Sequence, residues 1–212
     1  MTSSDHLSVG LASTALDIKN ARQFWYQVYV KEMQRHKDDA DHTLKELSDP
    51  YDTVGNLFIA RREGRIVGTV ITTYGEVADL GYYARLYKLE TLPASRLAEI
   101  SLTNKLIVAP EFRCGTLALK LAVETYRQAF VDGIGQTFID CNAHLESFFL
   151  RLGFVHHLGW VLHKDYGQVC SMTLNVMDIE HLQNVHSPFT KHFHALVGGH
   201  SHIERNHRRV TS

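Results

Sequence analysis

The chain has 212 residues, of which 44% are hydrophobic and 21% are charged, and its formal net charge is −1 at pH 7 with histidine neutral. This is an ordinary globular composition, long enough to bury a core, and the charge balance gives no sign of nucleic-acid binding. No apolar run reaches the roughly 18–20 residues of a membrane-spanning helix, and the first residues lack a secretory pattern, so the sequence predicts a cytoplasmic protein.

The three cysteines, Cys114, Cys141 and Cys170, are odd in number and far apart. They show no Cys-x-x-Cys spacing, so they predict neither a disulfide framework nor a zinc site, and we interpret them as small buried hydrophobic residues. The histidine pairs in 192–194 and 200–202 resemble metal-binding spacing only superficially, because no further ligands accompany them. The sequence therefore predicts no metal site.

The first quarter of the chain is predicted to contain an N-terminal arm, a helix, an acidic turn and a short helix. Residues 1–18 are small and polar with weak periodicity, which is typical of a mobile arm. A helical pattern follows from Asn20, a suitable N-cap, to about His36. The acidic segment 37–42 could bind a cation but is interpreted as a solvated turn, and a short helix is expected over 43–47.

A hairpin and a strand are predicted next. Two β-rich runs, 57–62 and 65–74, flank the turn residues Glu63-Gly64 and predict a β-hairpin. Helical turns are expected over 79–92. Residues 96–108 predict a strand whose second half is continuously apolar, as in a strand that enters the covered centre of a sheet.

The second half of the chain alternates helices and strands. The strongest helical pattern covers 116–131, where a broad apolar face recurs. Further elements are predicted at 137–141 (strand), 142–152 (helix closed by Gly153), 154–163 with 168–175 (antiparallel strands) and 178–196 (interrupted helix). The polar tail 198–212 is expected to be disordered. The sequence thus predicts one domain over 19–197, of the α+β (mixed α/β) class.

Two segments resemble the GCN5-related N-acetyltransferases. Residues 108–113, Val-Ala-Pro-Glu-Phe-Arg, which run into a helix, match that family's acyl-donor loop, and 142–154 match its later helix with a Gly-Phe ending. With the hairpin, the resemblance covers roughly residues 54–175. It implies a central mixed, mostly antiparallel sheet with helices on both faces. It also implies that backbone N–H groups, where two central strands splay apart, polarise the thioester carbonyl.

The donor loop departs from that family's pattern of alternating glycines. Cys114, Thr116 and Ala118 occupy the corresponding positions, and only Gly115 is a glycine. Side chains there obstruct a close approach of the backbone to the pyrophosphate of coenzyme A. A donor without that pyrophosphate, such as an acyl-phosphopantetheine on acyl carrier protein, needs less of such a loop.

A second resemblance points to the same donor. Glu99-Ile100-Ser101 is similar to the Glu-x-Ser-Arg of the acyl-homoserine-lactone synthases, which draw acyl groups from acyl carrier protein. Leu102 stands where that family has Arg, which argues against lactone formation. The N-acyl amino acid synthases, bacterial relatives of both groups, fit best, and Ser187-Pro188-Phe189 also resembles them. This resemblance implies transfer of a medium or long acyl chain from acyl carrier protein to the amine of an amino acid.

The resemblance assigns the catalytic roles to the first half of the strand. Glu99 is the candidate group that takes the proton of the acceptor ammonium. Ser101 and Thr103 lie on the same strand face by the two-residue period. Each could orient substrate or water or be an ordinary strand residue, and Thr103 is interpreted as the latter. The alternative for Glu99 is a solvated or salt-bridged carboxylate. His144 is a second candidate base that we interpret as structural.

The donor-binding residues are predicted at the end of the strand and the start of the next helix. Arg113 would contact a phosphate at the helix entry or lie solvated in the loop. Lys120 and Arg127 are candidate contacts for an acidic carrier protein, or simply a solvated helix face. The complete set of predicted donor-binding residues is Ile107, Val108, Arg113, Gly115 and Thr116.

No bound cofactor is predicted, because the acyl-phosphopantetheine of acyl carrier protein or coenzyme A is the donor itself. A coenzyme A-dependent N-acetyltransferase is the alternative enzyme. A non-catalytic binder of acylated carrier protein is the alternative of another class. Acyl-chain length, the acceptor amino acid and the oligomeric state remain open from the sequence.

Overall fold

The computed structural model describes residues 7–76 and 79–198 of the chain. Their contacts divide the chain into two compact units, unit 1 (Met1–Ala78 and Thr103–Thr125) and unit 2 (Asp79–Leu102 and Tyr126–Ser212). Residues 19–197, which the sequence predicts as one domain, are divided between these two units. Of the polar tail predicted over 198–212, only residue 198 lies within the described residues.

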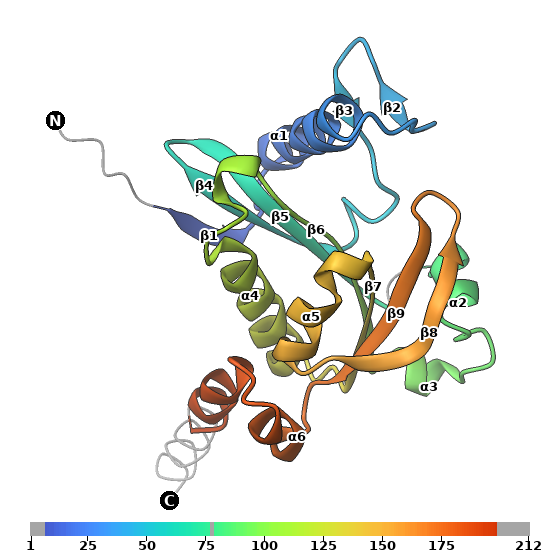
Figure 1. The fold of residues 1–212 in the computed structure, drawn as a ribbon, viewed down its shortest axis with the longest axis vertical. Helices are drawn as coiled ribbons and strands as arrows, with labels where there is room; N and C mark the ends of the chain where they lie inside the picture. Colours follow the sequence, from blue (N-terminus) through green and yellow to red (C-terminus); the bar gives the residue numbers. More distant parts are fainter. Residues whose placement is uncertain (1–6, 77–78, 199–212) are drawn as a thin grey trace, which may run out of the picture. The chain divides into compact units, whose positions relative to one another are not determined.

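Unit 1 contains the predicted hairpin. The strands β4 (Asn56–Arg62) and β5 (Arg65–Tyr74) pair antiparallel, as predicted (Figure 1). Glu63 and Gly64 connect them with φ values of 51° and 77°. Two consecutive left-handed residues give the turn a twist that matches the two strands, which explains the tight connection.

The predicted N-terminal arm differs from the structure. Strand β1 (Ser8–Leu11) pairs antiparallel with β4, and helix α1 (Ala15–Trp25) begins five residues before Asn20. Thr14 and Asp17 form a reciprocal capping box at the helix start. The prediction of a mobile arm is therefore wrong for the described residues after Leu7, because strand pairing and the cap stabilise a segment with weak hydrophobic periodicity. The π-helix η1 (Tyr26–Glu32) continues α1.

The short helix predicted over 43–47 is replaced by a small ladder. Strands β2 (Ala40–Asp41) and β3 (Glu46–Leu47) pair antiparallel. The Asp41 carboxylate accepts hydrogen bonds from the N–H groups of Thr43 and Leu44, both at 2.8 Å. This local side-chain bonding folds the chain into a turn and competes with helix formation.

Strand β6 (Ile100–Val108) contributes residues to both units. It starts four residues later than predicted because α3 (Ala94–Leu97) takes up the beginning of that segment. Within unit 2, β6 runs parallel to β7 (Gln136–Cys141) over three residue pairs that begin with Ile100 and Gln136. The strand order of the sheet is β1-β4-β5-β6-β7-β9-β8, where β8 is Val155–His163 and β9 is Gly167–Asn175. The pairs β1–β4, β4–β5, β7–β9 and β8–β9 are antiparallel.

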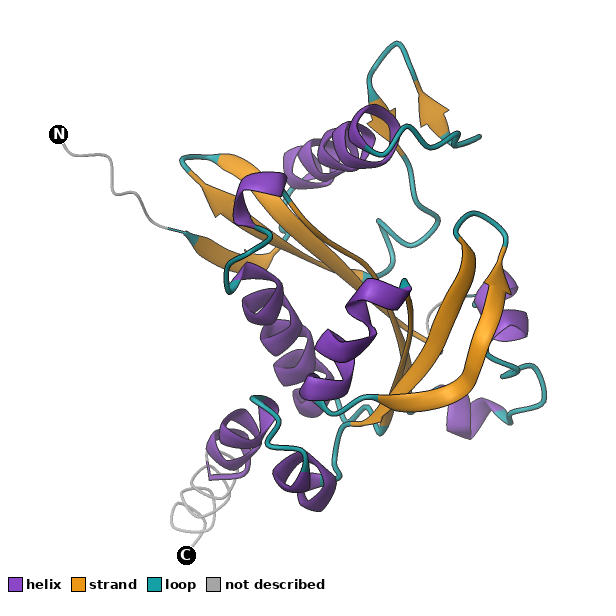
Figure 2. Ribbon diagram, in the orientation of Figure 1, coloured by secondary structure: helices purple, strands orange, loops and turns teal. Residues whose placement is uncertain are grey.

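Among the described residues, unit 2 holds the remaining strands and five helical segments besides the second half of α4. The strands β8 (Val155–His163) and β9 (Gly167–Asn175) form the second predicted hairpin (Figure 2). Gly153, at φ 106°, ends the helix before them as predicted. The helices of this unit are α2 (Gly81–Leu86), α3, α5 (Ala143–Leu152), α6 (Ile179–Asn184) and a last one at 189–198.

Helix α4 (Leu117–Val131) follows the strongest helical pattern of the sequence. Its first half packs in unit 1 against Gly68 of β5, where an added Cβ would lie 3.0 Å from Leu121 Cδ1 and 3.2 Å from the carbonyl oxygen of Ile107. The absence of a side chain at Gly68 therefore sets how closely α4 approaches the strands. The buried core at this place consists of Phe58, Ala60, Val67, Val70, Val108, Ala109, Leu117 and Leu121.

Among the described helices, none is both long and apolar enough to cross a membrane.

Candidate active site

The donor loop of unit 1 is a tight connection between β6 and α4. Ala109 donates its N–H to the carbonyl of Val67 at 2.9 Å, which attaches the end of β6 to β5. A 3-10 turn, η2 (Pro110–Phe112), follows, and α4 begins at Leu117. Because Val108 and Leu117 belong to the same buried core, both ends of the loop are fixed by packing.

Arg113 is the best-fixed side chain of the loop. Its Nε donates to the carbonyl of Val108 at 2.9 Å, and its two terminal nitrogens donate to the carboxylate of Glu32 at 2.5 and 2.8 Å. This is the bidentate geometry that a guanidinium and a carboxylate prefer. Arg113 therefore links the loop to η1, and the carboxylate of Glu32 compensates its charge.

The other predicted donor residues offer mainly backbone and packing. Ile107 and Val108 are buried. Gly115 donates its N–H to Phe112, and Thr116 accepts the first helical hydrogen bond, from Lys120. An α-helix leaves the first N–H groups at its start without intrahelical partners, and the first turn of α4 carries no acidic side chain. This end of α4 is thus suited to an anionic group.

Lys105 lies in β6 between Thr103 and the donor loop, and the sequence analysis did not select it. Its φ of 51° interrupts the extended backbone of the strand, and its carbonyl accepts a hydrogen bond from the Thr69 hydroxyl at 3.2 Å. The Lys105 ammonium pairs with Asp49 at 3.0 Å and lies 4.9 Å from the ring centroid of Trp25. A charged side chain this deeply placed is held by the ion pair and the cation–π contact together.

The two predicted catalytic residues differ strongly in environment within unit 2. Glu99 precedes the first residue of β6 and is exposed, and its carboxylate accepts a hydrogen bond from Arg96 at 2.8 Å. Ser101 is fully buried, and its hydroxyl has no hydrogen-bond partner among the described residues. A buried hydroxyl without a partner costs free energy, which makes Ser101 a candidate for contact with a substrate or water.

The predicted carrier-protein contacts Lys120 and Arg127 both lie exposed on α4. They are seven residues apart, two helical turns, so they share one face of the helix. His144, the second candidate base, is exposed in the first turn of α5. The two basic side chains of α4 and the imidazole of His144 therefore lie at the surface.

A titratable group that the sequence analysis missed lies on β7. The carboxylate of Asp140 accepts a hydrogen bond from the hydroxyl of Tyr87 at 2.7 Å. Burial raises the pKa of Asp140, against the lowering effects of the Tyr87 hydrogen bond and of the charge of His163. The pKa of Tyr87 lies well above its usual value, also mainly because of burial. The signal in the sequence was a single acidic residue in the apolar strand 136–141.

Aromatic rings pack around His163, whose charge acts on the Asp140 carboxylate. His163 is buried, and its Nδ1 accepts a hydrogen bond from the N–H of Asp165 at 3.0 Å. The His163 ring lies 5.1 Å from the ring of Tyr82 and 4.5 Å from that of Tyr166. Burial favours the neutral form of a carboxyl group, consistent with the direction of the Asp140 pKa. Perturbed pKa values of this kind concentrate at functional sites.

Comparison with known proteins identifies the fold. No protein-family model matches the sequence, and no curated protein matches it. Among solved structures, MesI, a CoA-dependent acyl-homoserine lactone synthase, superposes with a TM-score of 0.65 at 18% identity, over 84% of this chain and 93% of its own. FeeM, an N-acyl amino acid synthase from uncultured soil microbes, superposes with a TM-score of 0.62 at 12% identity, over 88% of this chain and 97% of its own.

A third structure, the CoA-dependent acyl-homoserine lactone synthase BjaI solved with SAM and isopentyl-CoA, matches with a TM-score of 0.64 at 16% identity, over 86% of this chain and 91% of its own. The predicted fold class is therefore confirmed. The chain has the mixed α/β fold of the GCN5-related acyltransferases, with a seven-stranded, mostly antiparallel sheet.

Proposed function

We propose that this protein is an N-acyltransferase that moves a medium or long acyl chain from acyl carrier protein to the amine of an amino acid. The observation that carries the proposal is the fold, which is shared over more than four fifths of the chain with acyl-transferring synthases. The donor loop, whose two ends are fixed by packing, and the start of α4 support the choice of this region for the donor.

The donor half of the reaction is assigned to the donor loop and to helix α4. The first turn of α4 binds the phosphate of the phosphopantetheine arm, and Ile107 and Val108 line the path of the arm. Arg113, fixed by Glu32, holds the loop in place. Lys120 and Arg127 receive the acidic surface of the carrier protein. A single glycine in the loop favours acyl carrier protein over coenzyme A.

The acceptor half is assigned to Glu99 and Ser101. The amine nitrogen attacks the thioester carbonyl carbon, the new C–N bond forms, and the C–S bond breaks. Before the attack the acceptor ammonium loses one proton to Glu99, directly or through water, and after the attack the nitrogen loses a second proton, which protonates the departing thiolate. Ser101 orients the amine or the water, because its buried hydroxyl has a free hydrogen-bonding capacity.

Asp140 is a second candidate for the proton acceptor. Its raised pKa brings it closer to the range in which a carboxylate is an effective general base at neutral pH. Glu99 is exposed and paired with Arg96, whereas Asp140 is partly buried and bonded to a neutral hydroxyl. Substitution of each carboxylate by its amide distinguishes the two candidates.

The test is a donor and acceptor matrix with the purified full-length chain. Acyl carrier protein and coenzyme A, each loaded with chains from acetyl to palmitoyl, are incubated with the amino acids, and N-acyl amino acids are measured by mass spectrometry. Turnover with long-chain acyl carrier protein is the expected result. Because MesI and BjaI are CoA-dependent synthases, the assay must include the coenzyme A donors as well as acyl carrier protein.

The other outcomes define the alternatives. Turnover with acetyl-coenzyme A alone would identify a coenzyme A-dependent N-acetyltransferase. Binding of acylated carrier protein without turnover would identify a non-catalytic binder. Lipid extracts of a bacterium that expresses the protein provide an independent measurement, because an accumulating N-acyl amino acid reveals chain length and acceptor together.

A further inference from the structure

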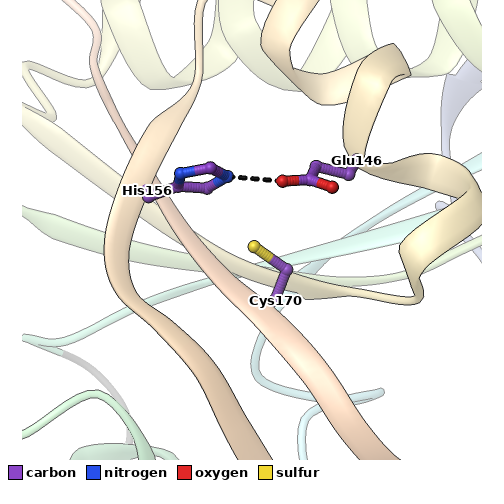
Figure 3. Close-up of side chains that lie close together, drawn as sticks. All are labelled: Glu146, His156 and Cys170. Carbon is purple, nitrogen blue, oxygen red and sulfur yellow. Dashed lines mark hydrogen bonds and ion pairs between the residues drawn. The ribbon is translucent and has the colours of Figure 1, made fainter.

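Three potential metal ligands from three different elements of unit 2 converge. Glu146 belongs to the first turn of α5, His156 to β8 and Cys170 to β9, and their ligand atoms all lie within 4.8 Å of one another (Figure 3). We propose that these three side chains form a binding site for a divalent metal ion of the zinc type. No step of the proposed acyl transfer uses them.

Local structure brings the three side chains together. The ladder between β8 and β9 shifts its register between His156 and Gly159, and such a bulge re-aims a side chain relative to the regular strand. Cys170 lies directly opposite Cys141 of β7 and is fully buried. Glu146 reaches the same place from α5, which packs on β9.

The donor set suits zinc among the common divalent ions. A thiolate, an imidazole and a carboxylate are the three ligand types that zinc accepts, at about 2.3 Å for sulfur and about 2.0–2.2 Å for nitrogen and oxygen. Hard ions such as magnesium and calcium prefer oxygen ligands alone. Three protein ligands leave a fourth position for water, the arrangement of open zinc sites.

Two of the three side chains contact each other directly. His156 Nε2 and Glu146 Oε1 are 2.6 Å apart, within hydrogen-bonding distance. Metal binding exchanges the His156–Glu146 contact for two coordinate bonds and adds a bond to the Cys170 sulfur.

Cobalt(II) is the probe for the test, because it occupies zinc sites and its bond to a thiolate produces a sulfur-to-cobalt absorption band. The full-length chain is freed of metal with a chelator, titrated with Co²⁺ and then with Zn²⁺. One equivalent of Co²⁺ per chain with a thiolate band is expected, followed by loss of the band when zinc displaces cobalt. The many histidines elsewhere in the chain cannot produce this band.

The variants assign the site. Cys170→Ser is expected to abolish the thiolate band, whereas the matched controls Cys141→Ser, at the neighbouring buried cysteine, and Cys114→Ser, at the exposed one, retain it. His156→Ala, at an exposed position that tolerates substitution, is expected to weaken binding more than about tenfold. The His156→Ala variant still tests the site if Cys170→Ser fails to fold.

Stability provides a second readout. Zinc ties α5 to β8 and β9, so it should raise the thermal unfolding midpoint of the natural chain but not that of His156→Ala. Absence of a thiolate band in the natural chain overturns the proposal, as does a band that persists in Cys170→Ser. Equal zinc stabilisation of the natural chain and His156→Ala also overturns it.

Discussion

Unit 1 and unit 2 hold their polar side chains in different ways. In unit 1, charges face opposite charges, as in the pairs Arg113–Glu32 and Lys105–Asp49. In unit 2, Asp140 faces the neutral hydroxyl of Tyr87. An opposite charge keeps a titratable group ionised and fixed. Burial beside a neutral partner instead brings the free energies of the protonated and the deprotonated form of the group closer together. The first arrangement suits a binding loop, and the second suits proton transfer.

The largest expected effect comes from a substitution of Glu99. This residue is the proposed proton acceptor of unit 2, and its carboxylate pairs with the charged side chain of Arg96. Glu99→Gln is expected to lower kcat about 100-fold, within the usual range for loss of a general base. The free energy of unfolding should change by less than about 1 kcal/mol, because the pair with Arg96 is exposed. Steady-state kinetics and urea unfolding measure the two quantities.

Arg96→Gln is the matched control, since it breaks the same ion pair but leaves the carboxylate. It should remain active. A fully active Glu99→Gln together with an inactive Asp140→Asn would transfer the proton-acceptor role to Asp140 and would strengthen the contrast between the units.

The packing of unit 1 under the donor loop is tested by Gly68→Val. The new side chain would meet Leu121 and the Ile107 carbonyl, and overpacking of this kind should lower the free energy of unfolding by about 2 kcal/mol. Gly10→Val in β1 is the control, because an added Cβ there has no neighbouring atom within 4 Å. Equal effects of both substitutions in urea unfolding would show that α4 does not depend on Gly68.

The Arg113–Glu32 pair is expected to act on the donor alone. Arg113→Gln and Glu32→Gln should each raise the KM for the acyl donor about fivefold to tenfold with little change in kcat, because the loop loses its fixed position. Arg113→Lys should not restore binding, since an ammonium cannot form the two parallel bonds.

A double-mutant cycle checks this interpretation. If both residues act through one contact, the double variant should be no worse than either single variant. Additive losses would instead indicate that Arg113 contacts the donor directly.

The smallest expected effect concerns the pH dependence of stability at Asp140. Its pKa in the folded state is raised above the ordinary value of 3.8, so the unfolded chain loses this proton first as the pH rises. The folded state then binds more protons, and stability falls from about pH 4 up to the folded pKa. Asp140→Asn removes this loss, so its stability advantage should grow with pH over that window in urea unfolding. A constant difference would contradict the raised pKa.

Local patterns in the sequence determined much of this protein. The hairpin around Glu63-Gly64, helix α4 and the helix end at Gly153 were all predicted, because a turn, a broad apolar face or a left-handed glycine is encoded within a few residues. A salt-bridged Glu99 was also among the interpretations, and its partner Arg96 is only three residues away.

Only the tertiary structure decided the contacts between distant segments. The partner of Arg113 is 81 residues away, that of Asp140 is 53 residues away, and β1 pairs with β4 although its own sequence has weak periodicity. The convergence of Glu146, His156 and Cys170 likewise depends on a bulge in β8 and the register of β9. Hydrophobic periodicity and turn-forming residues act between positions that are close in the sequence, whereas these pairings depend on which strands become neighbours in the folded sheet.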